Sequence, residues 1–375
     1  MIQSVPRAVG MWWRGIDRTL LFVILALIAT GLVLSMAASP AAAERLGIDE
    51  PFYFFFRQSV FAGLSVIVLL AISALSPKGA RRLAAVAMIG AFVLLILTLL
   101  VGYEVKGATR WLRVGPFSLQ PSEFLKPAFL VTAAWLFSEE KRGAPVPGQL
   151  IAFGLYLVAV GLLMMQPDFG QTVLLTLCFG GIFFASGLSW LWVAVLGSLA
   201  ASGSTLAYFT FPHIASRVDR FLNPESGDTY QIDRATEAIS RGGIAGVGPG
   251  EGEVKHLLPD AYTDFIFSVA AEEFGLIASL AIIGLFAILV TRAWMQVMRL
   301  QDGFAQLAVA GLALQFGLQS LVNIAVNLNL IPPKGMTLPF VSYGGSSMLA
   351  LAFGAGLLLA FTRRRPGAYT PRYAA

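Results

Sequence analysis

The stretch FGQTVLLTLCFGGIFFASGLSWLWVAVLGSLAASGSTLAYFTFPHIAS, residues 169–216, holds 48 residues without one Asp, Glu, Lys or Arg. A helix crosses the hydrocarbon core of a bilayer with about 20 apolar residues. The stretch is therefore too long for one span and long enough for two. We predict two membrane-spanning helices here, joined by a turn near Gly187.

The composition of the whole chain also indicates a membrane protein. Of its 375 residues, 57% are hydrophobic and only 13% are charged, whereas a soluble domain carries about 25% charged residues. The 26 Lys and Arg exceed the 21 Asp and Glu, which fits positively charged cytoplasmic loops and contact with anionic lipid. We predict no nucleic-acid partner. The single cysteine, Cys178, excludes a disulfide framework.

Other charge-free stretches place the remaining spans. They are 19–43, 58–77, 83–103, 127–138, 143–167, 274–291, 303–333 and 335–362. Because 127–138 is too short to cross a bilayer, we expect its helix to include Glu123 and Lys126. With the pair in 169–216, the count is about ten, so the sequence predicts an all-α integral membrane protein. Residues 19–362 form its single polytopic domain, and the first span is retained rather than cleaved.

Basic residues orient the chain, since short cytoplasmic loops are enriched in Lys and Arg. With both termini inside, short cytoplasmic segments hold 14 of the 26 basic residues, including the arginines at 363–365. We therefore predict an N-in, C-in protein of a bacterial inner membrane. Residues 1–18 form a cytoplasmic arm, without regular structure in 1–17, and residues 363–375 form a basic cytoplasmic tail.

This orientation places three loops outside the cytoplasm: 104–122, 206–264 between spans seven and eight, and 329–344. Within the second loop, residues 217–264 hold 14 of the chain's 47 charged residues. Long polar loops on a compact scaffold commonly carry function. We therefore expect the active site on the periplasmic side.

Asp264 ends the polar loop and opens an apolar helix in LPDAYTDFIF, residues 258–267. Two roles stay open for it. A carboxylate at a helix N-terminus is stabilised by the helix, and a partly buried one can act as a general base with a raised pKa. Glu272 and Glu273 follow within the apolar helix, where carboxylates usually face the protein interior and have a partner.

The segment GATRWLR, residues 107–113, sets two arginines beside a tryptophan. Arginine binds phosphate with two hydrogen bonds, and tryptophan prefers the membrane interface. Arg110 and Trp111 are therefore candidates to bind a phosphate beside a lipid tail, the alternative being an interfacial anchor. Glu123 and Lys126 are three residues apart on one helix face and can pair, pointing inward.

Three further stretches interrupt the apolar pattern. The densest, PPKGMTLPFVSYGGSS at 332–347, has three prolines and three glycines. Irregular backbone at membrane depth is tolerated where it is buried or lines a cavity, which would make Lys334 a lone cation there. The turn QPDFGQ at 166–171 gives Asp168 a structural role. The glycine-rich segment 242–250 lacks a P-loop lysine and is a flexible or backbone-binding loop.

Metal chemistry has weak support in the sequence. The only histidines, His213 and His256, are far apart and lack ligand spacing, so we predict no protein metal site.

Together these motifs resemble the SEDS family of shape, elongation, division and sporulation proteins over nearly the whole chain. The resemblance is concentrated in 107–126, 166–171, 258–275 and 329–347, and the Pro-Lys-Gly before Thr337 is most like the division branch. It implies a ten-helix fold. It also implies a glycosyltransferase that polymerises lipid II, the undecaprenyl-pyrophosphate-linked disaccharide peptide, into septal peptidoglycan.

The resemblance further assigns residues and partners. Asp264 matches the essential aspartate of the family's Thr-Asp-Phe-Ile-Phe motif and is the expected base of an inverting transfer. The expected substrate-binding residues are Arg110, Trp111, Glu123, Lys126, Lys334 and Ser342. A class B penicillin-binding protein and other division proteins are the implied partners at the septum. No cofactor is certain, although a divalent cation, Mg²⁺ or Mn²⁺, at the pyrophosphate fits the chemistry.

Two other functions remain open. A lipid II flippase needs a polar path from inside to outside, whereas here the polar residues crowd the outer side and the inside turn at 187–190 has no charged residue. A division scaffold without chemistry predicts that changing Asp264 causes no catalytic defect.

Overall fold

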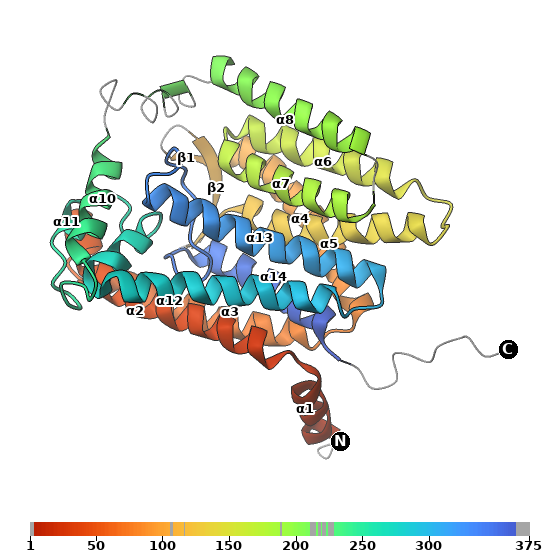
Figure 1. Cartoon of the computed structure of the whole chain (residues 1–375), viewed down its shortest axis with the longest axis horizontal. Helices are drawn as coiled ribbons and strands as arrows, with labels where there is room; N and C mark the ends of the chain where they lie inside the picture. Colours follow the sequence, from red (N-terminus) through yellow and green to blue (C-terminus); the bar gives the residue numbers. More distant parts are fainter. Residues whose placement is uncertain are drawn as a thin grey trace.

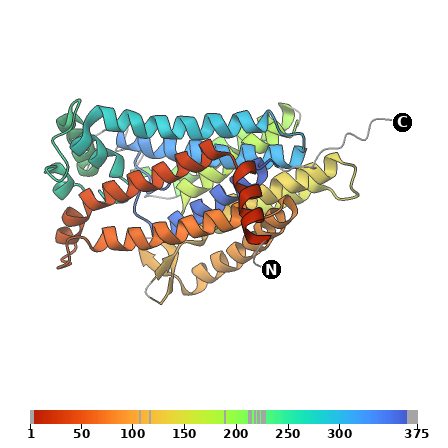
Figure 2. The same ribbon diagram turned by 90° about the horizontal axis from the view of Figure 1, so that it is seen from below.

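A computed structural model describes residues 4–105, 108–115, 117–187, 190–210 and 229–364, with a few residues between 215 and 223. Parts of the predicted loop 206–264 and most of the predicted tail 363–375 lie outside the described residues. The helices run side by side along one long axis (Figures 1 and 2). The strands, α10 and α11 lie at one end, and α1 and the end of α14 lie at the other (Figure 1).

The elements follow in chain order. They are α1 (Ser4–Gly15), α2 (Arg18–Arg45), α3 (Tyr53–Ser73), α4 (Pro77–Val101), β1 (Tyr103–Val105), β2 (Ala108–Val114), β3 (Phe117–Leu119), α5 (Pro121–Lys141), α6 (Gly148–Met165), α7 (Phe169–Ala185), α8 (Trp190–Thr210), α10 (Tyr230–Gly242), α11 (Val254–Leu257), α12 (Ile266–Val297), α13 (Gly303–Asn327) and α14 (Gly345–Thr362).

Seven helices in the described part of the chain are long and apolar enough to cross a membrane: α2, α3, α4, α6, α12, α13 and α14. The remaining long helices are α5, which carries charged residues, α7, which is apolar but has 17 residues, and α8. The integral membrane class is supported, while the count of ten and the orientation stay predictions.

Two local predictions are confirmed by the helix ends. Glu123 and Lys126 lie in the first turns of α5. The turn near Gly187 separates α7 from α8, and Gly187 has φ of +83°, which glycine adopts without strain.

Two expectations were wrong. The N-terminal segment is not without structure, because residues 4–15 form α1, whose apolar residues gather on one side. The protein is not purely α-helical, since β1, β2 and β3 make a small antiparallel sheet in the loop after α4. The break predicted at 329–344 is confirmed, since α13 stops at Asn327 and α14 starts at Gly345. Three prolines in this stretch disfavour a helix.

The core is centred on α14, which is buried on all sides between α3, α5 and α13. A helix that is apolar all round belongs in the middle of a bundle. Its neighbour α13 contributes Phe316, whose ring stacks at 5.8 Å on Phe340 of the irregular 329–344 segment. The second half of the irregular segment, residues 336–342, is thus packed into the core, whereas residues 329–335 are exposed or half-buried.

The helix α12 is interrupted at Gly275, which has φ of +73° and ψ of −169°. The interrupted turn pairs through its backbone with the glycine-rich segment. Val247 N donates to Glu272 O at 2.9 Å, and Leu276 N donates to Gly243 O at 3.0 Å. The backbone-binding interpretation of 242–250 is therefore confirmed.

We predict that Gly275→Ala destabilises the protein by about 3 kcal/mol, because its backbone conformation is strained for any other residue. In addition, an added Cβ would lie 2.4 Å from Gly246 N. Gly284→Ala in the same helix is the matched control, since a Cβ there meets nothing within 4 Å. Thermal unfolding in detergent measures both. Equal unfolding temperatures for the two variants would contradict this account of the kink.

Candidate active site

Asp264 lies in the turn between α11 and α12, and its main chain is held from α13. Asn323 Nδ2 and Asn327 Nδ2 donate to Asp264 O at 2.9 and 3.0 Å. Asn323 Nδ2 also donates to Met336 O at 2.7 Å. One amide therefore joins the turn that carries Asp264 to the irregular segment. The half-buried carboxylate faces that segment, since a Cβ added at Gly335 would lie 3.3 Å from Asp264 Oδ2.

Ser342 makes a second link between the same two segments. Its hydroxyl donates to Thr263 O at 2.6 Å and accepts from Leu338 N at 2.8 Å. Tyr343 N donates to Tyr262 O at 2.9 Å. Ser342 is buried, so its contacts in the structure are internal. It holds the Asp264 turn against the irregular segment.

Lys334 directly precedes Gly335 and reaches towards the start of α7. Its ammonium lies 5.3 Å from the centroid of the Phe169 ring. A Cβ added at Gly170 would lie 3.9 Å from Lys334 Cβ. The turn at 166–170 and the irregular segment therefore adjoin, with Lys334 between them.

Arg110 reaches the same turn from β2. Its side chain donates to the carbonyls of Gln166 and Pro167, and its Nη1 lies 3.8 Å from Asp168 Oδ1. Burial raises the pKa of the Asp168 carboxyl, and the nearby Arg110 charge opposes this increase. Trp111 is half-buried and, as the next residue of the strand, points to the opposite face of the sheet from Arg110.

Beneath these groups, Lys126 lies in a buried polar network. Its ammonium donates to Glu123 Oε2 at 2.9 Å, Gln171 Oε1 at 2.7 Å and Gln319 Oε1 at 3.3 Å, which uses all three of its protons. Gln319 Nε2 passes the network on to Thr337 O at 3.1 Å. Lys126 and Glu123 are 1% and 3% exposed, so they support the site from below.

The second pair of acidic residues is also partnered. Glu273 forms a buried ion pair with Lys255, and Glu272 accepts from Val254 N at 2.8 Å and Lys255 N at 3.1 Å. The expectation that carboxylates within this apolar helix face inward with a partner is confirmed. This pair fixes α11 against α12 just before the Asp264 turn.

Tyr262 adds a phenol to the wall of the site. Burial, with the nearby charge of Asp260, raises the pKa of Tyr262 to about 12. The phenol is therefore neutral at pH 7. Its ring packs on Phe54 at 4.5 Å and on Tyr343 at 5.5 Å, which makes an apolar border beside Asp264.

The sequence matches the model of the cell cycle protein family that comprises FtsW, RodA and SpoVE over residues 18–366. The chain belongs to this family. The SEDS resemblance of the motifs is thereby confirmed, and the motifs of the candidate site lie within the matched residues.

Relatives within the family cover nearly the whole chain. The protein named probable peptidoglycan glycosyltransferase FtsW from Caulobacter vibrioides is 52% identical over 362 residues, which is 96% of this chain and 93% of the relative. The protein of the same name from Trichlorobacter lovleyi is 36% identical, with 92% of each chain covered.

Solved structures agree with the fold. A chain from a study of polymerization and crosslinking by a peptidoglycan synthase complex superimposes with a TM-score of 0.74 at 30% identity, covering 92% of this chain and 97% of that one. The rod shape determining protein RodA of Thermus thermophilus gives a TM-score of 0.67 at 28% identity, covering 93% and 97%.

The candidate site is built partly by residues that the sequence analysis did not propose as site residues. Asn323, Asn327 and Gln319 contact the site from α13, and Gln171 contacts it from α7. A signal for three of them was present, because Gln319, Asn323 and Asn327 recur every fourth residue within an apolar span. That spacing places them on one helix face.

We predict that Lys126→Met lowers stability by about 3–5 kcal/mol, because it leaves the Glu123 carboxylate buried without its cation. The double variant Glu123→Gln with Lys126→Met removes both charges and is expected to recover much of this loss. Thermal unfolding in detergent compares the two. An unfolding temperature for Lys126→Met equal to that of the wild type would show that the pair does not support the site.

Proposed function

We propose that this chain is a peptidoglycan glycosyltransferase that polymerises lipid II at the division septum. The observation that carries the proposal is the position of the half-buried Asp264 carboxylate beside Gly335, next to Lys334. The names of the relatives in the same family agree with this activity.

The proposed reaction joins two lipid-linked sugars. Asp264 accepts the proton of the acceptor's 4-hydroxyl as that oxygen attacks the anomeric carbon of the donor muramyl sugar. The bond from that carbon to the pyrophosphate breaks, and undecaprenyl pyrophosphate leaves with inversion at carbon. A positioned general base contributes about 10²–10⁴-fold to such a step.

Cationic side chains stabilise the leaving pyrophosphate in this scheme. Arg110, which is partly exposed beside Asp168, and Lys334 are the two groups able to reach a bound phosphate. Charge stabilisation aimed at the leaving group commonly supplies a large share of the rate enhancement. Trp111 contributes an interfacial surface for the lipid. Glu123, Lys126 and Ser342 position the turn and the irregular segment through their internal contacts.

The proposed reaction does not depend on a metal ion held by the protein. Among the described residues, no group of three or more His, Cys, Asp or Glu side chains is placed to hold a metal ion. A divalent cation at the pyrophosphate would take its ligands mainly from phosphate oxygens and water. No step is assigned to it.

The proposed topology has about ten spans with both termini in the cytoplasm, so that Asp264 faces the periplasm. The basic residues of the short loops support this orientation. The proposed partner is a class B penicillin-binding protein, which crosslinks the new strands, together with other division proteins. The likeness to a chain of a peptidoglycan synthase complex supports a partner of this kind.

We predict that Asp264→Asn abolishes glycan polymer, with a loss of at least about 100-fold in rate, because the amide cannot accept the proton. The purified chain, with and without its penicillin-binding partner, receives labelled lipid II, and polymer is resolved on a gel. Asp260→Asn is the matched control, since it removes a carboxylate four residues away in the same turn.

Polymer from the wild type and from Asp260→Asn, but not from a folded Asp264→Asn, supports the base. Equal polymer from Asp264→Asn and wild type would remove Asp264 from the mechanism. No polymer from any of the proteins, with the partner and divalent ions present, would favour transport or scaffolding instead.

A further inference from the structure

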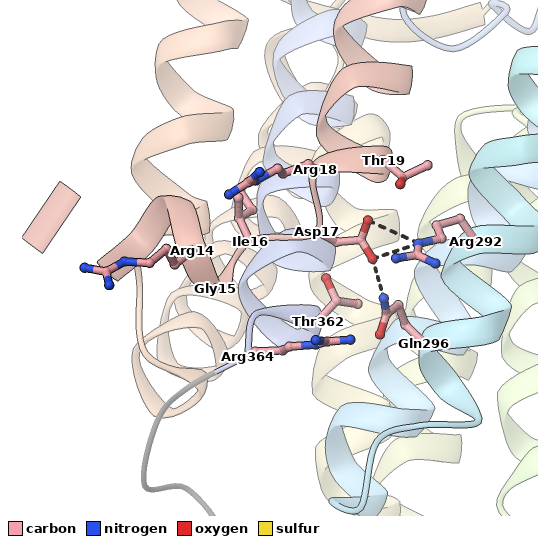
Figure 3. Close-up of a pocket in the computed structure, with 10 residues that line it drawn as sticks. All are labelled: Arg14, Gly15, Ile16, Asp17, Arg18, Thr19, Arg292, Gln296, Thr362 and Arg364. Atoms are coloured by element: carbon pink, nitrogen blue, oxygen red, sulfur yellow. Dashed lines mark hydrogen bonds and ion pairs between the residues drawn. The ribbon is translucent and has the colours of Figure 1, made fainter. Parts of the chain in front are cut away.

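A cavity of about 240 Å³ lies where the α1–α2 junction meets the ends of α12 and α14. Figure 3 shows its lining residues, and Figure 1 shows that this end of the bundle is opposite to the strands and α11. The cavity is therefore separate from the candidate active site. Its lining residues are Arg14, Gly15, Ile16, Asp17, Arg18, Thr19, Arg292, Gln296, Thr362 and Arg364.

The two ends of the described chain close this cavity. Arg364 N donates to Gly15 O at 2.9 Å. A Cβ added at Gly15 would lie 2.4 Å from Arg364 O, so only glycine allows the two segments to approach this closely. The segment that follows α14 is thus fixed against the start of α2.

The one acidic side chain that lines the cavity, Asp17, is paired with other residues of the protein. Asp17 Oδ1 accepts from Leu20 N at 3.1 Å and caps α2. Its carboxylate also pairs with Arg292, with 2.9 Å between Arg292 Nε and Asp17 Oδ2, and it accepts from Gln296. Figure 3 shows these contacts on one side of the cavity.

The charges that remain favour an anion. Among the ten lining residues, Asp17 is the only acid against four arginines, a surplus of three positive charges. Figure 3 shows Arg364 near Thr362 and Gln296, while Arg14 and Arg18 extend from the α1–α2 junction away from Asp17. Arginine matches the oxygens of a phosphate with paired hydrogen bonds.

An exposed apolar surface adjoins the arginines. Met11 and Phe22 are 57% and 56% exposed. The Trp13 ring meets Phe22 edge-on at 6.2 Å and lies 4.9 Å below the Arg18 guanidinium. Trp12 anchors α1 to the bundle through a 3.0 Å hydrogen bond to Ser73 Oγ. A helix with basic residues beside exposed apolar ones is typical of a helix lying in the membrane interface.

We propose that this cavity binds the phosphate of an anionic phospholipid, with the acyl chains along Met11, Trp13 and Phe22. The arginine surplus accounts for the phosphate. The apolar surface beside it accounts for a lipid rather than a soluble phosphate ester. Since both ends of the chain line the cavity, a bound headgroup holds the α1–α2 junction, α12 and α14 together.

The test uses the full chain purified in neutral detergent, with lipid retention followed by native mass spectrometry. The probes are phosphatidylglycerol, phosphatidylcholine and soluble glycerol phosphate. We expect saturable binding of phosphatidylglycerol, and we expect phosphatidylcholine to bind more weakly. Arg14→Gln, Arg18→Gln and Arg364→Gln should each weaken it about fivefold, from the usual effect of one basic residue near anionic lipid.

Arg82→Gln is the matched control, since Arg82 is exposed in the second turn of α4 at the same end of the bundle. It removes the same charge outside the cavity. Arg292 is left unchanged, because its loss would leave the buried Asp17 carboxylate without its cation. Met11→Ser tests the surface proposed to contact the acyl chains and should also weaken the binding of phosphatidylglycerol.

Three results would overturn the proposal. Equal binding of phosphatidylglycerol and phosphatidylcholine would remove the role of charge. An effect of Arg82→Gln as large as that of Arg14→Gln would show adsorption to the whole basic end of the protein. If millimolar glycerol phosphate displaces phosphatidylglycerol and Met11→Ser does not change lipid binding, the cavity binds a soluble phosphate ester instead.

Discussion

The amide of Asn323 is the contact on which the candidate site depends. It donates to two backbone carbonyls, one in the Asp264 turn and one in the irregular segment at Met336. Neither segment is helical there, so neither satisfies these carbonyls within its own structure. A buried carbonyl without a partner costs about 1–3 kcal/mol. The Asn323 amide removes this cost at Met336 O and shares Asp264 O with Asn327, and so it fixes one segment relative to the other.

Asn327 extends the same arrangement by one turn of α13. Its Nδ2 donates to Asp264 O, while its Oδ1 accepts from Ser268 N at 3.1 Å. That N–H belongs to the first turn of α12 and is shared, since it also donates to Phe265 O at 3.0 Å. The two asparagines thus connect the start of α12 to α13 and fix the main chain on which the Asp264 carboxylate is mounted. Between helices surrounded by lipid, such hydrogen bonds add specificity that apolar packing alone does not give.

The helical bundle could be predicted from the sequence, because the thickness of the bilayer sets the length of the charge-free stretch that each spanning helix needs. The turn near Gly187 and the inclusion of Lys126 in a helix followed from the same argument and are confirmed. The motif residues were found by their chemistry, since a charged side chain within an apolar span is costly and usually has a structural or functional role. The inward direction of Lys126 was predicted, whereas the burial of Ser342 required the structure.

Other features could not be predicted from local pattern. The strands β1 and β3 have three residues each, too few to show a period. Helix α1 is short, and its stability depends on contacts such as Trp12 to Ser73 that lie far apart in sequence. The amides of α13 were visible as a row, but their partners are carbonyls of irregular segments, which no sequence period identifies.

The most direct test of this account is hydrogen–deuterium exchange of the peptides that cover 258–268 and 332–342, comparing Asn323→Leu with Gln315→Leu. Gln315 is buried in the same helix and its Oε1 has no partner among the described residues, so its loss leaves both segments in place. We expect both peptides to exchange faster in Asn323→Leu than in the wild type, and to exchange at the wild-type rate in Gln315→Leu. Unchanged exchange in the two peptides of Asn323→Leu would contradict this account.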